Sequence, residues 1–310
     1  MGLCHAVPAA AKPKNDPAAQ TAPQAPAPPT TPTKPKIVPG SDPGGVAVAI
    51  IGTGVNYTLP QIANRLARDG EGDIIGLDFI DRDNRPFDRG PDLAPAPFGA
   101  SPMGTTPASL ILAEAPRARL VPVRALVSDP RQLGGAAAFV AAPPARIVLV
   151  AFTSPNRAGW ESFERAAKAA PNVLFVLPAG DANQDLDQHP LFPARLDLPN
   201  AVVVTAASAD GLILPDANSG VRSVDVAVSA HDALALAQDG STVKVSGSLY
   251  AASRVAALAA RLLEVDRGLT VAGINAQLAA VAIPTRGDVK MRTRLGWIAR
   301  PEAVTLGSKP

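Results

Sequence analysis

Continuous apolar runs of strand length recur along the chain from residue 46 onward. Six such runs lie at residues 46–52, 73–79, 118–126, 146–152, 172–179 and 200–207. An apolar run without polar alternation is typical of a strand that is buried on both faces of a parallel sheet. The pattern therefore predicts a mostly parallel sheet with little solvent-facing surface.

Segments with helical spacing of apolar residues alternate with these runs. Four lie between them and read LPQIANRLARDG, GTTPASLILAEAP, LGGAAAFVAA and NRAGWESFERAAKAAP; two follow at residues 249–265 and 270–282. Most end at Gly or Pro, and Thr270 is a predicted N-cap of the last one. Strands that alternate with helices predict an α/β fold with three layers, a doubly wound sheet with helices on both faces.

The first 45 residues show no such periodicity and consist largely of Ala, Pro, Thr and Lys. A chain of this composition buries too little apolar surface to fold. We therefore predict a disordered tether over 1–45, one domain over 46–305 and a short tail over 306–310. Ala/Pro tethers are typical of bacterial envelope proteins. The opening MGLC fits either the remnant of a lipoprotein or signal region or a plain terminus with an incidental cysteine.

No stretch approaches the 18 apolar residues of a membrane span, and no signal-peptide core is visible. We therefore expect no transmembrane span. The localisation stays open, with an extracytoplasmic position in the periplasm or on the envelope favoured.

Composition narrows the classes of partner. The 310 residues are 47% hydrophobic, which suffices for a sizeable core, and the formal net charge is only +2. No basic stripe with interleaved aromatic residues is present, so we expect no nucleic-acid partner. The single cysteine, Cys4, has no partner for an internal disulfide. We predict no cofactor.

Five segments then follow one another in the order of one family's motifs. They are AVAIIGTGVNYTLPQI, PMGTTPASLILAEAPRARLVPVRAL, VLFVLPAGDANQDLD, SGSLYAASRVAALAARLLEVDRGLT and LGWIARPEAV. Each resembles the matching stretch of the subtilisin-like serine peptidases, including the strand before the aspartate turn, the histidine helix and the serine helix. The resemblance covers roughly 45–305 and implies the subtilisin-like fold.

The resemblance also implies that the catalytic positions have changed. Gly52 stands where the family carries its aspartate, Met103 where it carries its histidine, and Leu249 where it carries its serine nucleophile. Asp181 stands at the asparagine that donates to the oxyanion. A serine hydroxyl needs an imidazole to take its proton, and the imidazole needs a carboxylate to orient it. We therefore predict a catalytically inactive member, a pseudopeptidase.

An enzyme with a displaced active site is the alternative. Ser248 directly precedes Leu249, and His189 with Asp187 is the pair that the resemblance brings toward the old cleft. Ser246 and Ser253 lie near the same turn, and the other two histidines are His5 and His231. In this alternative Ser248 is the nucleophile of a serine endopeptidase and His189 is its base.

For the inactive chain we expect a binding or scaffold role. The former cleft would hold a protein or an extended peptide by strand addition, and its candidate contacts are Met103, Phe152, Thr153 and Leu249. A competing interpretation assigns these side chains no binding role. In that case the apolar residues only fill the space of the former polar site, and the domain is a remnant of the fold without a partner.

Metal binding is not predicted. The run DFIDRDNRPFD contains Asp78, Asp81, Asp83 and Asp88, but it lacks the glycine and terminal glutamate of an EF-hand, and we interpret it as a solvated turn. The pair Asp185 and Asp187 receives the same interpretation.

Overall fold

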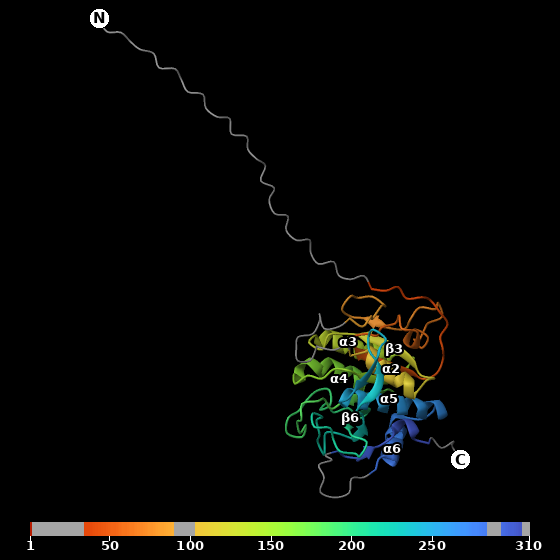
Figure 1. The fold of residues 1–310 in the computed structure, drawn as a ribbon, viewed down its shortest axis with the longest axis vertical. Coiled ribbons are helices and arrows are strands. Elements are labelled where there is room, and N and C mark those ends of the chain that lie inside the picture. Colours follow the sequence, from red (N-terminus) through yellow and green to blue (C-terminus); the bar gives the residue numbers. More distant parts are fainter. Residues whose placement is uncertain (2–33, 90–102, 284–292, 306–310) are drawn as a thin grey trace. The chain divides into compact units, whose positions relative to one another are not determined.

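The computed structural model describes residue 1 and residues 34–89, 103–283 and 293–305. An eight-stranded sheet runs through the domain in the order β10-β7-β6-β5-β4-β1-β3-β2, and each recorded pair of neighbours is parallel (Figure 1). The strands are β1 (Ala47–Gly52), β2 (Leu77–Asp78), β3 (Arg119–Arg124), β4 (Ala145–Val150), β5 (Leu174–Pro178), β6 (Ala201–Ala207), β7 (Val226–Ser229) and β10 (Trp297–Ile298). Two further strands, β8 (Ala233–Leu236) and β9 (Thr242–Val245), form an antiparallel hairpin.

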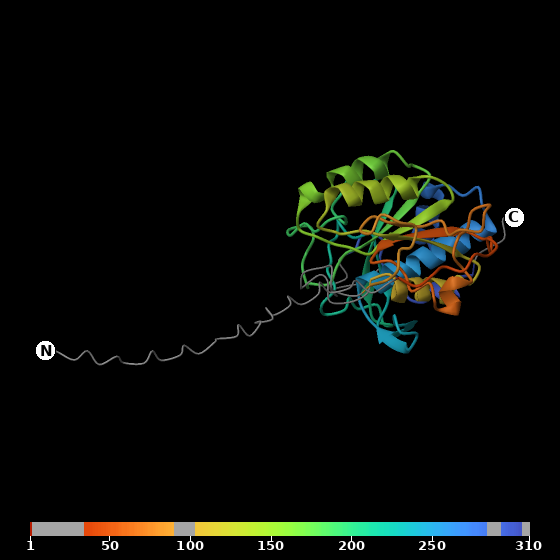
Figure 2. The same cartoon turned by 90° about the horizontal axis from the view of Figure 1, so that it is seen from above.

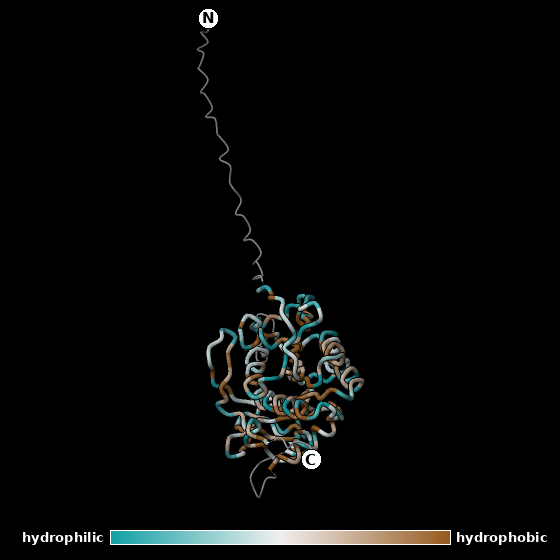
Figure 3. The backbone as a smooth tube through the Cα atoms, turned by 90° about the vertical axis from the view of Figure 1, so that its right-hand side faces the viewer, coloured by the Kyte–Doolittle hydropathy of each residue, from teal (hydrophilic) through white to brown (hydrophobic). Residues whose placement is uncertain are grey.

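Helices cover both faces of the sheet, as Figure 2 shows. They are α1 (Pro60–Ala63), α2 (Thr105–Glu114), α3 (Pro130–Ala141), α4 (Glu161–Lys168), α5 (Ser248–Val265) and α6 (Val271–Val281), with 3-10 turns η2 (Arg157–Trp160) and η3 (Pro301–Ala303). One apolar cluster packs α2, α5 and α6 on one face, and a second packs α3 and α4 on the other. Figure 3 shows that hydrophobic stretches recur throughout the domain.

The apolar pattern predicted most of these elements. Each of the six runs contains a strand, and β1 at the centre of the sheet is buried at all six residues. The last helix begins as expected, because the Thr270 hydroxyl accepts a hydrogen bond from the backbone N–H of Gly273. A central strand packs against helices from both faces, so it carries no polar alternation.

Two predicted elements are much shorter than expected. The helix expected over residues 59–70 is reduced to α1, because the chain at Leu66 turns to pair with Leu120 of β3 instead. The run at 73–79 contributes only the two residues of β2, whose second residue is the buried Asp78. Backbone pairing with a neighbouring strand thus overrides the local helical pattern.

The interpretation of the acidic run as a solvated turn is wrong for Asp78 and Asp88, which are fully buried. Lys34 Nζ lies within 2.9 Å of a carboxylate oxygen of Asp78, Asp81 and Asp83. Arg124 Nη1 binds Asp78 at 2.9 Å and Asp81 at 3.1 Å. These five residues form what we call the ionic cluster. The three carboxylates are held in the fold because two buried cations face them.

Lys34 of the ionic cluster belongs to the segment before residue 46, which was predicted to be a tether. Lys34 is 7% exposed, and the Tyr57 hydroxyl donates to the Pro35 carbonyl at 3.0 Å. Asp42 forms an ion pair with Arg119. Residues 34–45, which were expected to belong to the tether, thus pack on the domain, since their polar groups find fixed partners there.

Within the described ranges, no helix is long and apolar enough to cross a membrane. The same residues contain no group of three or more His, Cys, Asp or Glu side chains placed to hold a metal ion.

Candidate active site

The segments that carry the family-like motifs meet at the carboxyl edge of the sheet. Gly52 is the last residue of β1, Asp181 follows the end of β5, and Leu249 is the second residue of α5. Met103 directly precedes Gly104, the N-cap of α2. Ligand sites of open parallel sheets lie at this edge, in the crevice beyond the strand ends.

Gly52 and Met103 are in close contact through the backbone. A Cβ built at Gly52 would lie 2.7 Å from the Met103 carbonyl oxygen and 3.3 Å from the Cβ of Ala151. The Met103 N–H donates to the Thr53 hydroxyl at 2.8 Å, which fixes the two segments together. The position at which the family carries a carboxylate is therefore closed to any side chain in this arrangement.

Asp88 joins the segments of Thr53 and Thr105, which follow Gly52 and Met103 in the sequence. Its carboxylate accepts hydrogen bonds from the Thr53 hydroxyl at 2.6 Å and from the Thr105 hydroxyl and N–H at 2.6 and 2.9 Å. Burial raises the pKa of Asp88, and these hydrogen bonds oppose the rise. Asp88 thus caps the first turn of α2 from a distant loop, where Gly104 has no side chain to do so. This role was not predicted from the sequence.

Asp181 faces the start of α5. Its Oδ1 accepts from the Ser248 N–H and from the Ser248 hydroxyl, each at 2.9 Å. The pKa of Asp181 is raised, chiefly because the surrounding chain removes hydration and also because Asp216 repels it; Ser248 opposes this rise. The family's asparagine would donate a hydrogen bond at this position through its amide. The Asp181 carboxylate instead accepts hydrogen bonds from the start of α5, where the backbone N–H groups favour an anion.

Asn218 holds the loop that carries Asp181. Its side chain is buried, donates to the Ala179 carbonyl at 2.8 Å and accepts from the N–H groups of Ala182 and Gln184 at 3.0 and 2.8 Å. Asn218 lies 36 residues after Ala182 in the sequence, so its contact with this loop could not be predicted. The available signal was that it is a polar residue in a loop rich in Asp and Asn. It is a second positioning residue that sequence analysis missed.

The two long apolar side chains at the family's catalytic positions, Met103 and Leu249, border different parts of the core. Met103 is partly buried against the α3 and α4 side, whereas Leu249 is partly buried against the α2 and α5 side. Phe152 is 6% exposed and packs with the α3 and α4 cluster, so its side chain is enclosed by the core. Thr153 is half-buried. Of the four expected contact residues, Phe152 is thus the one without an accessible side chain.

The strand end that was expected to pair with a peptide is partly occupied by the chain itself. Ser154 exchanges backbone hydrogen bonds with Phe192 at 2.8 and 2.9 Å, in an antiparallel bridge. Strand addition beyond residue 153 therefore has to displace this loop.

Two residues of the displaced-site alternative, Ser248 and Asp187, form hydrogen bonds with other groups. Ser248 is fully buried, and its hydroxyl contacts the Gly180 carbonyl at 3.0 Å besides Asp181. His189 and His231 are exposed. The Asp187 carboxylate accepts hydrogen bonds from the Ser223 hydroxyl and the Arg222 N–H. Asp187 is therefore committed to orienting another loop.

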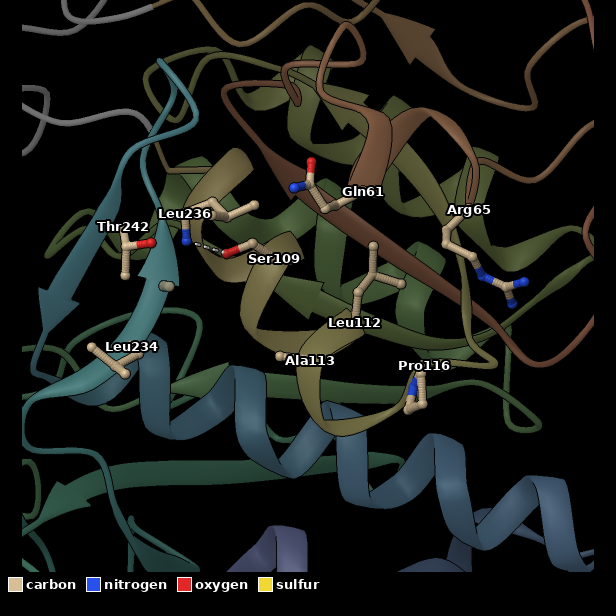
Figure 4. Close-up of a pocket in the computed structure, with 10 residues that line it drawn as sticks. Gln61, Arg65, Ser109, Leu112, Ala113, Pro116, Leu234, Leu236 and Thr242 are labelled. Atoms are coloured by element: carbon tan, nitrogen blue, oxygen red, sulfur yellow. Dashed lines mark hydrogen bonds between the residues drawn. The ribbon is translucent and has the colours of Figure 1, made fainter.

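A separate pocket of about 380 Å³ lies between α2, α1 and the β8–β9 hairpin (Figure 4). Leu112, Leu234 and Leu236 provide apolar walls, and the Ser109 hydroxyl accepts a hydrogen bond from the Leu236 N–H at 2.8 Å. Leu234 at the rim is 62% exposed. Such a hollow, mostly apolar with a few polar groups, has the character of a binding pocket.

Comparison with known proteins agrees with this architecture. A cold-adapted subtilisin-like serine proteinase matches with a TM-score of 0.66 and 22% identity, over 86% of this chain and 93% of its own. A lanthipeptide protease matches with a TM-score of 0.67 and 18% identity, over 84% and 88%. Proteases from Pseudoalteromonas arctica match with a TM-score of 0.64 and 20% identity, over 84% and 90%.

No curated protein matches the chain by sequence. The structural likenesses show a shared fold. The model of the subtilase family, peptidase S8, matches residues 44–297, which is most of the chain. The chain therefore belongs to the subtilase family.

Proposed function

We propose that this chain is a subtilase domain without peptidase activity, which binds a protein or an extended peptide instead of cutting it. The observation that carries the proposal is the Asp181 carboxylate, which accepts hydrogen bonds from Ser248 where the family's amide donates to an oxyanion. A carboxylate in that place opposes negative charge on a carbonyl oxygen. An oxyanion donor is worth about 3–4 kcal/mol in its usual orientation.

The remaining positions support the same proposal. Met103 has a thioether, which takes up no proton near neutral pH, and Leu249 offers no nucleophile. The close approach at Gly52 leaves no room for the carboxylate that orients an imidazole. Hydrolysis by the usual route needs all three groups to act as a unit.

A labelling experiment tests the loss of activity. The purified full chain is incubated with a fluorophosphonate serine-hydrolase probe and with casein, beside an active subtilisin. We expect neither labelling nor cleavage from a folded sample. Labelling that disappears in Ser248→Ala would overturn the proposal and favour the displaced nucleophile.

Binding is tested separately with a peptic digest of casein as a source of extended peptides. Hydrogen exchange of the full chain should show protection of residues 152 and 153, which follow the paired end of β4, when the peptides are present. The variant Leu249→Lys places a charge at the cleft and should abolish the protection. Leu212→Lys, at an exposed leucine of another loop, is the matched control and should leave it unchanged. If the peptides do not slow hydrogen exchange in the wild type, or if they slow it equally in Leu249→Lys and Leu212→Lys, the proposed binding role is contradicted.

A further inference from the structure

A second, smaller cavity lies at the opposite edge of the sheet from the cleft. It has a volume of about 120 Å³ and is bordered by the start of β1 at Ala47, by Arg119 and Arg146, and by Leu263 and Arg267 near the end of α5. Ala47 pairs in register with Arg119 of β3 and with Ala145 of β4, which places the cavity at the amino ends of three adjacent central strands. Nothing in the proposed function uses this edge.

The lining of this cavity is positively charged. Three of its eight lining residues are arginines, and none is acidic. Asp42 pairs with one of them, Arg119, from outside the lining. Three guanidinium groups with no carboxylate in the lining itself give the cavity a positive field, which favours a bound anion.

The guanidinium groups retain unused donors. Arg119 Nε is buried and has no hydrogen-bond partner among the described residues. Arg146 donates to three backbone carbonyls, of Asn172, Arg267 and Leu269, at 3.3, 3.1 and 2.9 Å. A guanidinium has five N–H groups, so Arg146 is held rigidly and still has two to offer. An oxyanion in the cavity would satisfy the buried Arg119 nitrogen, which is otherwise costly to leave unpaired.

We propose that this arginine cavity binds a phosphoryl group. Arginine forks match the oxygen geometry of phosphate, and charge-assisted hydrogen bonds of this kind are the strong ones. A volume of about 120 Å³ is that of about four water molecules at about 30 Å³ each, which is room for a five-atom oxyanion. The group is either a small phosphate or phosphomonoester, or the headgroup of an anionic lipid.

Calorimetric titration of the full chain with sodium phosphate at constant ionic strength tests the proposal. We expect saturable binding by the wild type. Arg267→Gln removes an exposed guanidinium from the rim and should weaken binding about tenfold, the effect of losing one charged hydrogen bond. Arg131→Gln, at an exposed arginine of α3 on the other side of the sheet, is the matched control and should bind as the wild type does.

Two further arms distinguish the source of the group. Glycerol 3-phosphate is titrated in solution, and vesicles of phosphatidylcholine with or without phosphatidic acid are tested by flotation. Binding to the soluble ester identifies a small phosphate ligand, whereas binding only to vesicles that contain phosphatidic acid identifies a lipid headgroup. Both outcomes support the cavity when Arg267→Gln reduces them. The absence of binding in every arm, or an equal loss in Arg131→Gln, overturns the proposal.

Discussion

Adding a single methyl group at Gly52 should destabilise the domain. In Gly52→Ala the new Cβ would lie 2.7 Å from the Met103 carbonyl oxygen, closer than real Cβ atoms approach a backbone oxygen. The Met103 segment cannot retreat freely, because its N–H is bonded to Thr53 and Ala151 lies 3.3 Å away on the other side. Overpacking of this kind costs about 1–3 kcal/mol. At about 2–4 °C per kcal/mol for a domain of this size, Tm should fall by roughly 2–12 °C.

Thermal unfolding followed by circular dichroism measures the effect, and Gly70→Ala is its matched control. A Cβ at Gly70 would meet nothing within 4 Å. Both substitutions reduce the entropy of the unfolded chain in the same way, so their difference isolates the contact at Met103. If Gly52→Ala unfolds at the temperature of the wild type or of Gly70→Ala, the close approach does not exist in solution. Gly52 would then no longer exclude a carboxylate at this position.

Three other changes test the buried polar groups. Lys34→Met leaves the ionic cluster short of a cation and should cost about 3–5 kcal/mol in urea unfolding, whereas Lys36→Met, at an exposed position, should change stability by less than about 0.5 kcal/mol. Burial raises the pKa of Glu114 to about 7 from its ordinary 4.5, so the folded state takes up a proton that the unfolded state releases. Stability from this group is therefore complete below pH 4.5 and is lost as the pH rises to about 7, by about 3 kcal/mol in total. Glu114→Gln should flatten that part of the pH profile, and the exposed Glu71→Gln should not. Ser248→Ala removes a buried hydroxyl from its two acceptors and should cost about 1–2 kcal/mol; an unchanged urea midpoint would contradict the hydrogen bonds described.

The fold was predictable because its signal is local and repeated. The central strands consist mainly of apolar residues, and β1 needs no distant information to be recognised as a buried strand. Gly52 and Met103, which the resemblance places at two catalytic positions of the family, lie in contact through their backbones. The hairpin of β8 and β9 was not predicted, because each strand has only four residues and a pattern of that length is ambiguous.

The polar framework could not be predicted, because its partners are far apart in sequence. Asp88 looks like one more acid in a charged run until Thr53 and Thr105 are placed around it. By sequence alone, Lys34 is part of a Pro-rich tether. In the structure its ammonium group binds the carboxylate of Asp78, which lies 44 residues away. A run of aspartates gives the same sequence signal whether it faces water or a buried cation, so pattern alone favours the commoner, solvated case.

The ionic cluster also determines where a mechanical load would enter the domain. A pull on the chain before Lys34 acts first on its ammonium, which is bonded to Asp78 on β2, the edge strand of the sheet. Asp78 shares its carboxylate with Arg124 of β3, so the load passes sideways into the sheet through charged hydrogen bonds. The strands β2 and β3 are joined by only two residue pairs. Under tension, the domain should therefore open from this edge, while the strands that carry the cleft stay together.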